Sequence, residues 1–584
     1  MNPDEAYGIK LATEPFLHGD HIYFTLNWIE KNKYASSINR FDGSKMEKVT
    51  SGNHERSAQW LGNTLYYVSY GKKVEKIMKT NPISEPVEIY SSESIQKFIF
   101  HKECIIAIVT DKADRKAPFA TSRVKYRFDS KGLLRKNSKL VIICEKAETL
   151  VEGDFNVTDV ASNGNRLVFV ATAEDDDREI QNVYELDLKS REYQKLTERG
   201  GAMSSICVAP DGTVAFTGHQ EGTKPWAVEK LIMPEKKFSV EIGKNASNSI
   251  VSDGFASGSQ SLLYDEGKYY MIGQDGGCAS LYSWDGKVHK VSEGEKVVHS
   301  ITVSSGNVGF IYSSPEKPSI ISFNGELDLN PEIHGRKPLK VSSGRIEGWL
   351  LLTDKKNPTV LFVHGGPHSA YGYAYYIEFN YLASNGLNIL YANPRGSAGY
   401  GQDYASGCVG DWGGSDMRDL FDILDKSVEE FSLAEKLAVS GGSYGGYMVN
   451  AIITKTDRFK CAVSERSISN LLSMCGTSDI GFWFNPEEIS VTDPWSKVGI
   501  ERLMEFSPIS KAKSARTPTM FIHGEEDYRC PIEQAEQMYT ALRMNGIDSV
   551  LVRYIGDGHE HARRGIPKNM KDRLQRKLEW FNLH

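Results

Sequence analysis

The segment KLAVSGGSYGGYMVN, residues 436–450, decides how the C-terminal part of this chain folds. The apolar run Leu437–Val439 predicts a strand, the residues from Tyr447 onward favour a helix, and Gly441-Gly-Ser443-Tyr-Gly445 joins the two. A serine at such a turn has a strained backbone and an exposed hydroxyl, and the flanking glycines remove Cβ atoms that would clash. The pattern predicts a nucleophile at Ser443, although alone it fits a glycine-rich turn without chemistry equally well.

The sequence around this segment alternates between strands and helices. We expect strands at 347–353, 359–363, 387–393, 436–440, 459–464, 517–523 and 549–555. Helices are expected at about 374–385, 414–430, 446–455, 467–474, 532–545 and 566–581. The alternation predicts a mostly parallel sheet covered by helices on both faces, with active groups at the carboxyl ends of the strands. This domain is expected to span residues 331–584.

A glycine loop, His364-Gly-Gly366-Pro367, follows the second of these strands. In α/β-hydrolases such a loop presents a backbone N–H to the oxyanion, together with the N–H of the residue after the nucleophile. The candidate oxyanion donors are therefore Gly366 and Tyr444. The tetrapeptide alone predicts only a turn, but its place about 77 residues before the G-x-S-x-G segment favours the catalytic interpretation.

The loop after the predicted strand at 517–523 reads His523-Gly-Glu-Glu-Asp527-Tyr-Arg529. Asp527 lies where the acid of a catalytic triad belongs, between a strand and the next helix. Glu525 and Glu526 are alternatives, and Asp527 could instead cap the helix.

The candidate base follows the last predicted strand, in Gly556-Asp-Gly-His559-Glu-His561. His559 comes directly after a glycine turn, and the chain order of nucleophile, acid and histidine is the order found in hydrolases. His561 is the alternative. His523 and His364 precede the acid and fit the base role poorly.

The first 330 residues contain β-rich runs at a spacing of roughly 40 residues, separated by Asn-Gly, Asp-Gly and Gly-Asn turns. This spacing is typical of propeller blades. We expect seven blades near 8–50, 57–92, 97–148, 156–199, 204–243, 259–295 and 299–327, in a domain that spans 1–330. A β-sandwich or two stacked β domains are the alternatives. The acidic run at 174–177 is interpreted as a solvated hairpin turn rather than a metal site.

Composition excludes several classes of protein. The formal net charge of −7 offers no basic surface for nucleic acid and no polybasic patch for a membrane. No stretch approaches the apolar length of a transmembrane helix, and the N-terminus does not read as a signal peptide. The eight cysteines are scattered without a C-x-x-C pair, which argues against a disulfide framework or a cysteine zinc site and favours a reducing compartment. A cytoplasmic protein is expected.

Five motifs together resemble the prolyl oligopeptidase family of serine peptidases: HGGP (364–367), NPRGSAGYG (393–401), GGSYGGYM (441–448), HGEEDYRCP (523–531) and GDGHEH (556–561). The resemblance implies a seven-bladed β-propeller that caps an α/β-hydrolase domain. True prolyl oligopeptidases resemble the chain less, because they have Asn where Tyr444 stands. Dipeptidyl peptidases share the Ser-Tyr pair, but we find no convincing counterpart of their amine-binding glutamates. The acylaminoacyl peptidase branch resembles the chain in its Asp-x-Arg spacing, which implies that Arg529 lies by the substrate site; a salt bridge within the loop is the alternative.

The expected function is that of a serine exopeptidase that releases N-acylated amino acids from short peptides through Ser443, Asp527 and His559, without metal or cofactor. Phe482, Trp483 and Phe484 are candidates for an apolar side-chain pocket, although they would serve equally well as core. A carboxylesterase with the same triad, an oligopeptidase or dipeptidyl peptidase of the same family, and a peptide-binding propeller with a relic hydrolase domain are the rivals. The sequence leaves a homo-oligomer open.

Overall fold

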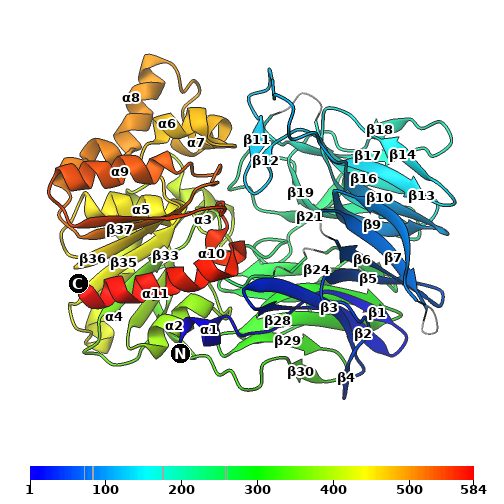
Figure 1. Cartoon of the computed structure of the whole chain (residues 1–584), viewed down its shortest axis with the longest axis horizontal. Helices are drawn as coiled ribbons and strands as arrows, with labels where there is room; N and C mark the ends of the chain where they lie inside the picture. Colours follow the sequence, from blue (N-terminus) through cyan, green and yellow to red (C-terminus); the bar gives the residue numbers. More distant parts are fainter. Residues whose placement is uncertain (72, 82–84, 174–176, 257, 260) are drawn as a thin grey trace.

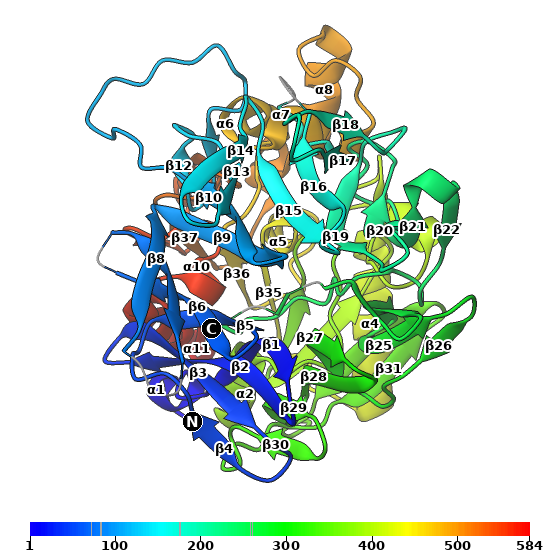
Figure 2. The same ribbon diagram turned by 90° about the vertical axis from the view of Figure 1, so that its right-hand side faces the viewer.

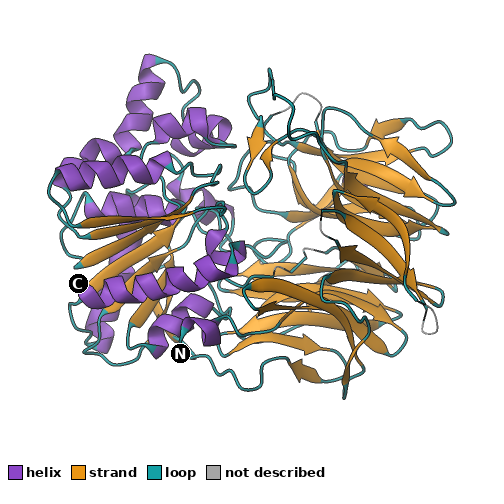
Figure 3. Cartoon of the chain, viewed as in Figure 1, coloured by secondary structure: helices purple, strands orange, loops and turns teal. Residues whose placement is uncertain are grey.

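The computed structural model describes residues 1–584 except 72, 82–84, 174–176, 257 and 260, so most of the acidic run at 174–177 lies outside the described residues. The chain forms two domains side by side (Figure 1). Helices gather in one domain, while the other is built of strands and loops (Figure 3). None of the described helices is both long and apolar enough to cross a membrane.

The strand-rich domain is a propeller whose seven four-stranded units surround a common centre (Figure 2). Successive units have their bounds as follows: β1–β4 (Leu11–His18, His21–Glu30, Lys33–Phe41, Met46–Lys48); β5–β8 (Glu55–Leu61, Thr64–Tyr70, Glu75–Thr80, Val87–Ser92); β9, β10, β13 and β14 (Ser94–His101, Cys104–Thr110, Lys139–Ile143, Ala147–Val151); β15–β18 (Val157–Ser162, Leu167–Thr172, Gln181–Leu186, Tyr193–Lys195); β19–β22 (Ala202–Val208, Val214–His219, Lys230–Met233, Phe238–Val240); β23–β26 (Leu263–Asp265, Lys268–Asp275, Cys278–Trp284, Val288–Lys290); and β27–β30 (Val297–Ser304, Asn307–Ser314, Lys317–Ser322, Glu326–Asp328). The predicted seven-bladed propeller is confirmed.

The third blade carries an insertion between β10 and β13. It contains a short hairpin formed by β11 (Arg127–Phe128) and β12 (Gly132–Leu133). In Figure 1 this hairpin lies on the side of the blade that faces the helical domain.

The helical domain contains an eight-stranded sheet with the order β31-β32-β34-β33-β35-β36-β37-β38. The strands β33 to β38 run parallel to one another. β31 and β32 lie at one edge of the sheet, where β31 pairs antiparallel with β32 and β32 pairs antiparallel with β34. The bounds are Leu339–Ser343 for β31, Ile346–Leu351 for β32, Thr359–Val363 for β33, Asn388–Asn393 for β34, Leu437–Gly442 for β35, Cys461–Glu465 for β36, Thr519–Gly524 for β37 and Ser549–Tyr554 for β38. This is the predicted α/β-hydrolase sheet, with β31 added.

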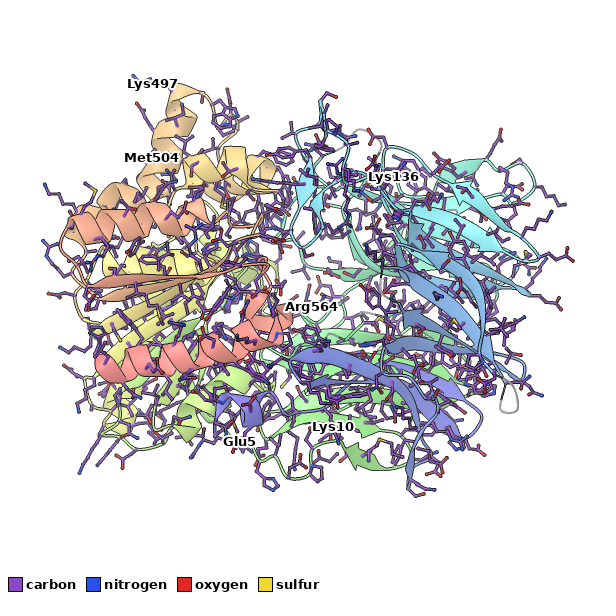
Figure 4. All side chains as sticks on the ribbon, in the orientation of Figure 1. Glu5, Lys10, Lys136, Lys497, Met504 and Arg564 are labelled. Atoms are coloured by element: carbon purple, nitrogen blue, oxygen red, sulfur yellow. A yellow bond between two sulfur atoms is a disulfide. The ribbon has the colours of Figure 1, made fainter. Side chains whose placement is uncertain are left out.

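Successive side chains of each strand point to opposite faces of this sheet, and both faces are apolar. Helices therefore cover both faces and form one hydrophobic core on each. Val360 and Phe362 face the core that contains α2 (Ile377–Ser384) and α11 (Pro567–Leu583). Leu361 and Val363 face the core that contains α4 (Ser415–Phe431), α5 (Tyr444–Ile453) and α9 (Glu533–Met544). The remaining helices are α3 (Gln402–Ala405), α6 (Leu471–Thr477), α7 (Gly481–Ile489), α8 (Lys497–Phe506) and α10 (His561–Arg564). Figure 4 labels Lys497 and Met504 on α8, which projects from the edge of the domain.

The chain crosses between the domains at its beginning as well as near residue 330. Helix α1 (Pro3–Ala6) packs against α2 and α11 of the hydrolase domain. The chain then passes from Glu5 to Lys10 into the first blade (Figure 4). Tyr7 is buried in a core that also contains Ile250 of the propeller and Phe379 of α2, so apolar packing continues across the interface.

The scattered cysteines predict no disulfide framework, but one pair is bonded. Cys104 on β10 and Cys144 just after β13 form a disulfide. The two strands are antiparallel neighbours that pair Ile105 with Ile143, and this register places the two cysteines opposite each other. The other six cysteines are free.

Candidate active site

Ser443 stands at a sharp turn between β35 and α5. Its backbone has φ +62° and ψ −123°, a region that residues with a side chain rarely adopt. A Cβ atom at Gly441 would lie 2.5 Å from the carbonyl oxygen of Gly445, and one at Gly445 would lie 2.1 Å from that of Val363. The two glycines of the motif are therefore required by close backbone contacts, as the sequence pattern predicts.

Asp527 and His559 lie in the loops after β37 and β38, and their side chains meet. His559 Nδ1 is 2.8 Å from Asp527 Oδ2, while Asp527 Oδ1 accepts hydrogen bonds from the N–H groups of Arg529 (3.0 Å) and Cys530 (2.8 Å). Burial alone would raise the pKa of Asp527, but the neighbouring His559 and His523 hold it well below its usual range. Asp527 is therefore an anion that can orient an imidazole.

The other candidate histidines occupy structural positions. His523 is fully buried behind the acid, with Nε2 3.3 Å from Asp527 Oδ2 and 2.7 Å from the carbonyl oxygen of Cys530. His561 is 1% exposed, and neither ring nitrogen has a hydrogen-bond partner among the described residues. Burial lowers the pKa of His561 well below its usual value, so this ring is a neutral part of the core.

The candidate oxyanion donors lie on either side of Ser443. Tyr444 is the first residue of α5, so its N–H has no acceptor within the helix, while its hydroxyl donates to Asp416. Gly366 and Gly365 line the same cavity as Ser443, and a Cβ at Gly365 would lie 3.4 Å from Ser443 Cβ. The glycine loop thus approaches the serine closely.

Within the part of the chain that the structure describes, Ser443 Oγ makes no hydrogen bond to His559. Its recorded contact is with Cys530 Sγ at 3.9 Å. Both Ser443 and His559 line one cavity, and catalytic hydrogen bonds are commonly long in enzymes without substrate.

This cavity has a volume of about 310 Å³ and lies between the domains. Val251, Ser252 and Asp253 of the propeller form one side, and the rest of the wall belongs to the hydrolase domain. Its apolar part includes Ile468, Met474, Ile480 and Phe484.

Trp483 does not line this cavity, whereas its neighbour Phe484 does, so a role of Trp483 in substrate binding stays a prediction. Residues 480 and 484 are one helical turn apart at the start of α7 and therefore share a face, and residue 483 points to one side of it.

Arg529 lines the cavity but is also held by an ion pair. Its Nε lies 2.7 Å from Asp479 Oδ1 and its Nη2 lies 3.1 Å from Asp479 Oδ2. Its position beside the cavity is thus compatible with a role at the substrate site, and its salt bridge joins the loop to the segment before α7.

Sequence reasoning missed Asp129, which belongs to the propeller yet contacts the loops of both Asp527 and His559. Asp129 Oδ1 accepts hydrogen bonds from the N–H groups of His559 (3.0 Å) and Tyr528 (3.1 Å). The available signal was length, because the predicted third blade at 97–148 is longer than each of the other six. The extra residues form the β11–β12 hairpin that carries Asp129.

Among the residues that the structure describes, one cluster has the side chains of a metal site: His368, Cys408 and Glu488 offer ligand atoms within 4.8 Å of one another. His368 already uses both ring nitrogens, with Glu488 Oε1 at 2.8 Å and the Gly396 carbonyl oxygen at 2.9 Å. The cluster is therefore explained as a hydrogen-bonded support for the loop after His364, and we assign no metal to it.

Two family models match the chain. Residues 25–318 match the N-terminal β-propeller domain of acylaminoacyl peptidase, and residues 373–584 match the prolyl oligopeptidase family. Among relatives, an uncharacterized peptidase, YuxL, of Bacillus subtilis is 35% identical over 347 residues, which is 55% of this chain. The acylamino-acid-releasing enzyme of Arabidopsis thaliana is 31% identical over 235 residues, or 39% of this chain. These matches span 52% and 30% of the respective relatives, about half of their length or less.

Solved structures share the fold over the whole chain. The acylaminoacyl peptidase of Pyrococcus horikoshii superposes with a TM-score of 0.87 and 21% identity, covering 100% of this chain and 97% of that one. A puromycin hydrolase superposes with a TM-score of 0.75 and 16% identity, covering 99% and 95%. With the propeller model matching half of the chain and the peptidase model matching the domain that holds Ser443, this chain belongs to the prolyl oligopeptidase family of serine peptidases, in its acylaminoacyl peptidase branch.

Proposed function

We propose that this protein is a serine exopeptidase that removes an N-acylated residue from short peptides. The observation that carries the proposal is the shared cavity: Ser443 on its strained turn and His559, paired with Asp527, line one space that the propeller covers. In this proposal Ser443 Oγ attacks the scissile carbonyl, and His559 accepts its proton and returns it to the leaving amine. Asp527 keeps the ring proton on Nδ1. The N–H groups of Gly366 and Tyr444 hold the oxyanion, and Phe484 contacts the apolar side chain.

The charges in the cavity wall support an acylated substrate over a free amine. An ammonium group needs an unengaged carboxylate, but each of the four acidic groups in the described wall already has partners: Glu465 and Glu378 with Arg573 and Lys577, Glu560 with Arg563, and Asp253 with the N–H groups of Ile377 and Glu378. Arg466, by contrast, lines the cavity as a cation, which disfavours an ammonium group there. This distribution favours release of acylated residues over dipeptidyl peptidase activity.

The size of the cavity supports short substrates. A volume of about 310 Å³ accommodates a few residues of an extended peptide but not a folded protein. We expect cleavage of a short acetylated peptide, slower cleavage of a thirty-residue acetylated peptide and none of casein. Comparable internal cleavage of all three would contradict the exopeptidase proposal.

The decisive experiment compares acetyl-alanyl p-nitroanilide, alanyl p-nitroanilide and p-nitrophenyl butyrate, together with labelling by a fluorophosphonate. We expect the acetylated amide to be preferred over the free amine, and the label to be found on Ser443. A rate on both amides no higher than that of Ser443→Ala, with rapid ester hydrolysis, would favour the carboxylesterase instead. Absence of both labelling and turnover would favour a binding protein.

We also propose that the protein is cytoplasmic. Six of its cysteines are free, four of them buried, and free thiols are typical of a reducing compartment. The Cys104–Cys144 disulfide is the observation against this location, because disulfides are rare in reducing compartments. Cell fractionation, with thiol labelling of the protein as isolated, tests it.

A further inference from the structure

The insertion in the third blade brings the propeller into contact with the hydrolase domain close to the candidate triad. Arg127 Nη2 donates to the carbonyl oxygen of Thr477 at the end of α6, and its guanidinium lies over the ring of Tyr528 at 4.9 Å. The N–H of Asp129 donates to Asp479 Oδ2 at 3.0 Å. The β11–β12 hairpin therefore docks on the loops that follow α6 and β37.

Asp129 itself joins the loops of the acid and the base. Its Oδ1 receives one N–H from Tyr528, the neighbour of Asp527, and one from His559, across 430 residues of sequence. The residue is 5% exposed, so water does not compete freely for these hydrogen bonds. A Cβ at Gly558 would lie 3.1 Å from Asp129 Oδ1, which shows how closely the carboxylate packs on the histidine loop.

The two N–H groups depend on this carboxylate. They belong to loop residues outside the regular hydrogen bonding of strands and helices, and leaving a buried N–H without an acceptor costs about 1–3 kcal/mol. Without Asp129, the two loops would move to recover acceptors, and the His559 imidazole would move with its backbone. Small displacements of this kind are costly, since a misplacement of about 1 Å can reduce a rate about 10²-fold.

We propose that Asp129 is a positioning residue of the active site: it fixes the loops of Asp527 and His559 relative to each other, so that the hydrolase site is complete only when the propeller hairpin is docked. The proposal rests on the proposed function, because it assigns Asp129 a role through the two residues of that triad. It makes the propeller a part of the catalytic geometry as well as a cover over the cavity.

The experiment compares Asp129→Ala with Asp129→Asn, and uses Lys131→Ala as the matched control. The alanine removes the acceptor, whereas the asparagine keeps an oxygen that can accept both N–H groups. Lys131 lies in the turn of the same hairpin, is exposed, and places its ammonium group over the ring of Phe128 on β11. The measured quantities are kcat and KM for acetyl-alanyl p-nitroanilide, the labelling rate of Ser443 by a fluorophosphonate, and the melting temperature.

We expect Asp129→Ala to lower kcat and the labelling rate by about 10- to 100-fold, with KM changed by less than about threefold. Asp129→Asn should restore kcat to within about threefold of the wild type, because the positioning hydrogen bonds persist. Lys131→Ala should match the wild type. A wild-type kcat for Asp129→Ala, equal losses for alanine and asparagine, or a loss confined to KM would each overturn the proposal.

A second variant covers the case in which Asp129→Ala does not fold. Arg127→Ala leaves the carboxylate in place but removes the anchor of the hairpin on Thr477, and it should lower kcat in the same sense by a smaller factor. An unchanged kcat would then overturn the inference. Fluorophosphonate labelling of the wild type distinguishes failure of the proposed function from failure of the role of Asp129. If Ser443 of the wild type is not labelled, the proposed function is refuted. If the wild type and the variant that folds are both labelled at the normal rate, only the role of Asp129 is refuted.

Discussion

Asp527→Asn tests the orientation of the candidate triad most directly. Asp527 Oδ1 accepts the N–H groups of Arg529 and Cys530, so the asparagine must keep its carbonyl oxygen at that position. Its NH₂ group then replaces Oδ2, 2.8 Å from His559 Nδ1. Because an NH₂ group only donates, Nδ1 must become an acceptor and the ring proton must move to Nε2. His559 can then no longer take a proton from Ser443.

The expected loss in kcat for this wrong tautomer is about 10⁴-fold, equivalent to about 5.5 kcal/mol in the activation free energy. The fold should be kept, because the replacement is nearly isosteric and the two backbone hydrogen bonds remain. The assay is steady-state hydrolysis of acetyl-alanyl p-nitroanilide, with circular dichroism to confirm folding.

Glu525→Gln is the matched control, since Glu525 lies in the same loop but forms an exposed ion pair with Arg553 at 2.7 Å. It should keep activity to within about twofold, because exposed ion pairs contribute little. If Asp527→Asn loses less than about tenfold while folded, or Glu525→Gln loses more, the tautomer argument and the assignment of the acid are refuted.

Three further outcomes follow from the same geometry. His559→Gln should abolish turnover, whereas His561→Gln should leave kcat within about tenfold and act mainly on thermal stability, because His561 is core; the reverse pattern of kcat values would contradict the assignment of the base. Asp253→Ala should lower the free energy of unfolding by about 0.5–2 kcal/mol, because Asp253 caps the N–H groups at the start of α2, and unchanged chemical denaturation would exclude this cap. Burial lowers the pKa of His299 and of His364 to about 4, below the usual 6.5 of an unfolded chain. The unfolded chain therefore binds more protons between these values, so the free energy of unfolding should fall by up to about 3 kcal/mol per histidine as the pH drops from 6.5 to 4; a denaturation midpoint that is constant across this window would contradict it.

Much of the fold could be predicted because its signals are local. Each blade repeats strands and turns within some 40 residues, and each element of the hydrolase sheet shows its own apolar run. The loops of Ser443, Asp527 and His559 follow such strands directly, and parallel strands bring their carboxyl ends together at one edge. The position of these three residues in one domain therefore follows from the topology.

The parts that could not be predicted depend on contacts between distant segments. Asp129 lies in a polar hairpin whose own sequence shows no catalytic pattern, and its partners lie in the other domain. The Cys104–Cys144 pair depends on the register of two strands separated by an insertion. Helix α7 escaped prediction because it contains Pro486, which ordinarily indicates a break.

The two crossings of the chain restrict how the propeller can move. The segment that follows α1 and the segment between β30 and β31 both connect the domains on the side where blades one and seven lie (Figure 1). Because these two connections are neighbours, the propeller cannot rotate freely relative to the hydrolase domain. The rotation that they still allow is a tilt about the line that joins them. Such a tilt separates the domains most at the opposite rim, where the β11–β12 hairpin lies. A tilt in that direction would separate Asp129 from the N–H of His559, and closing of the domains would restore this hydrogen bond.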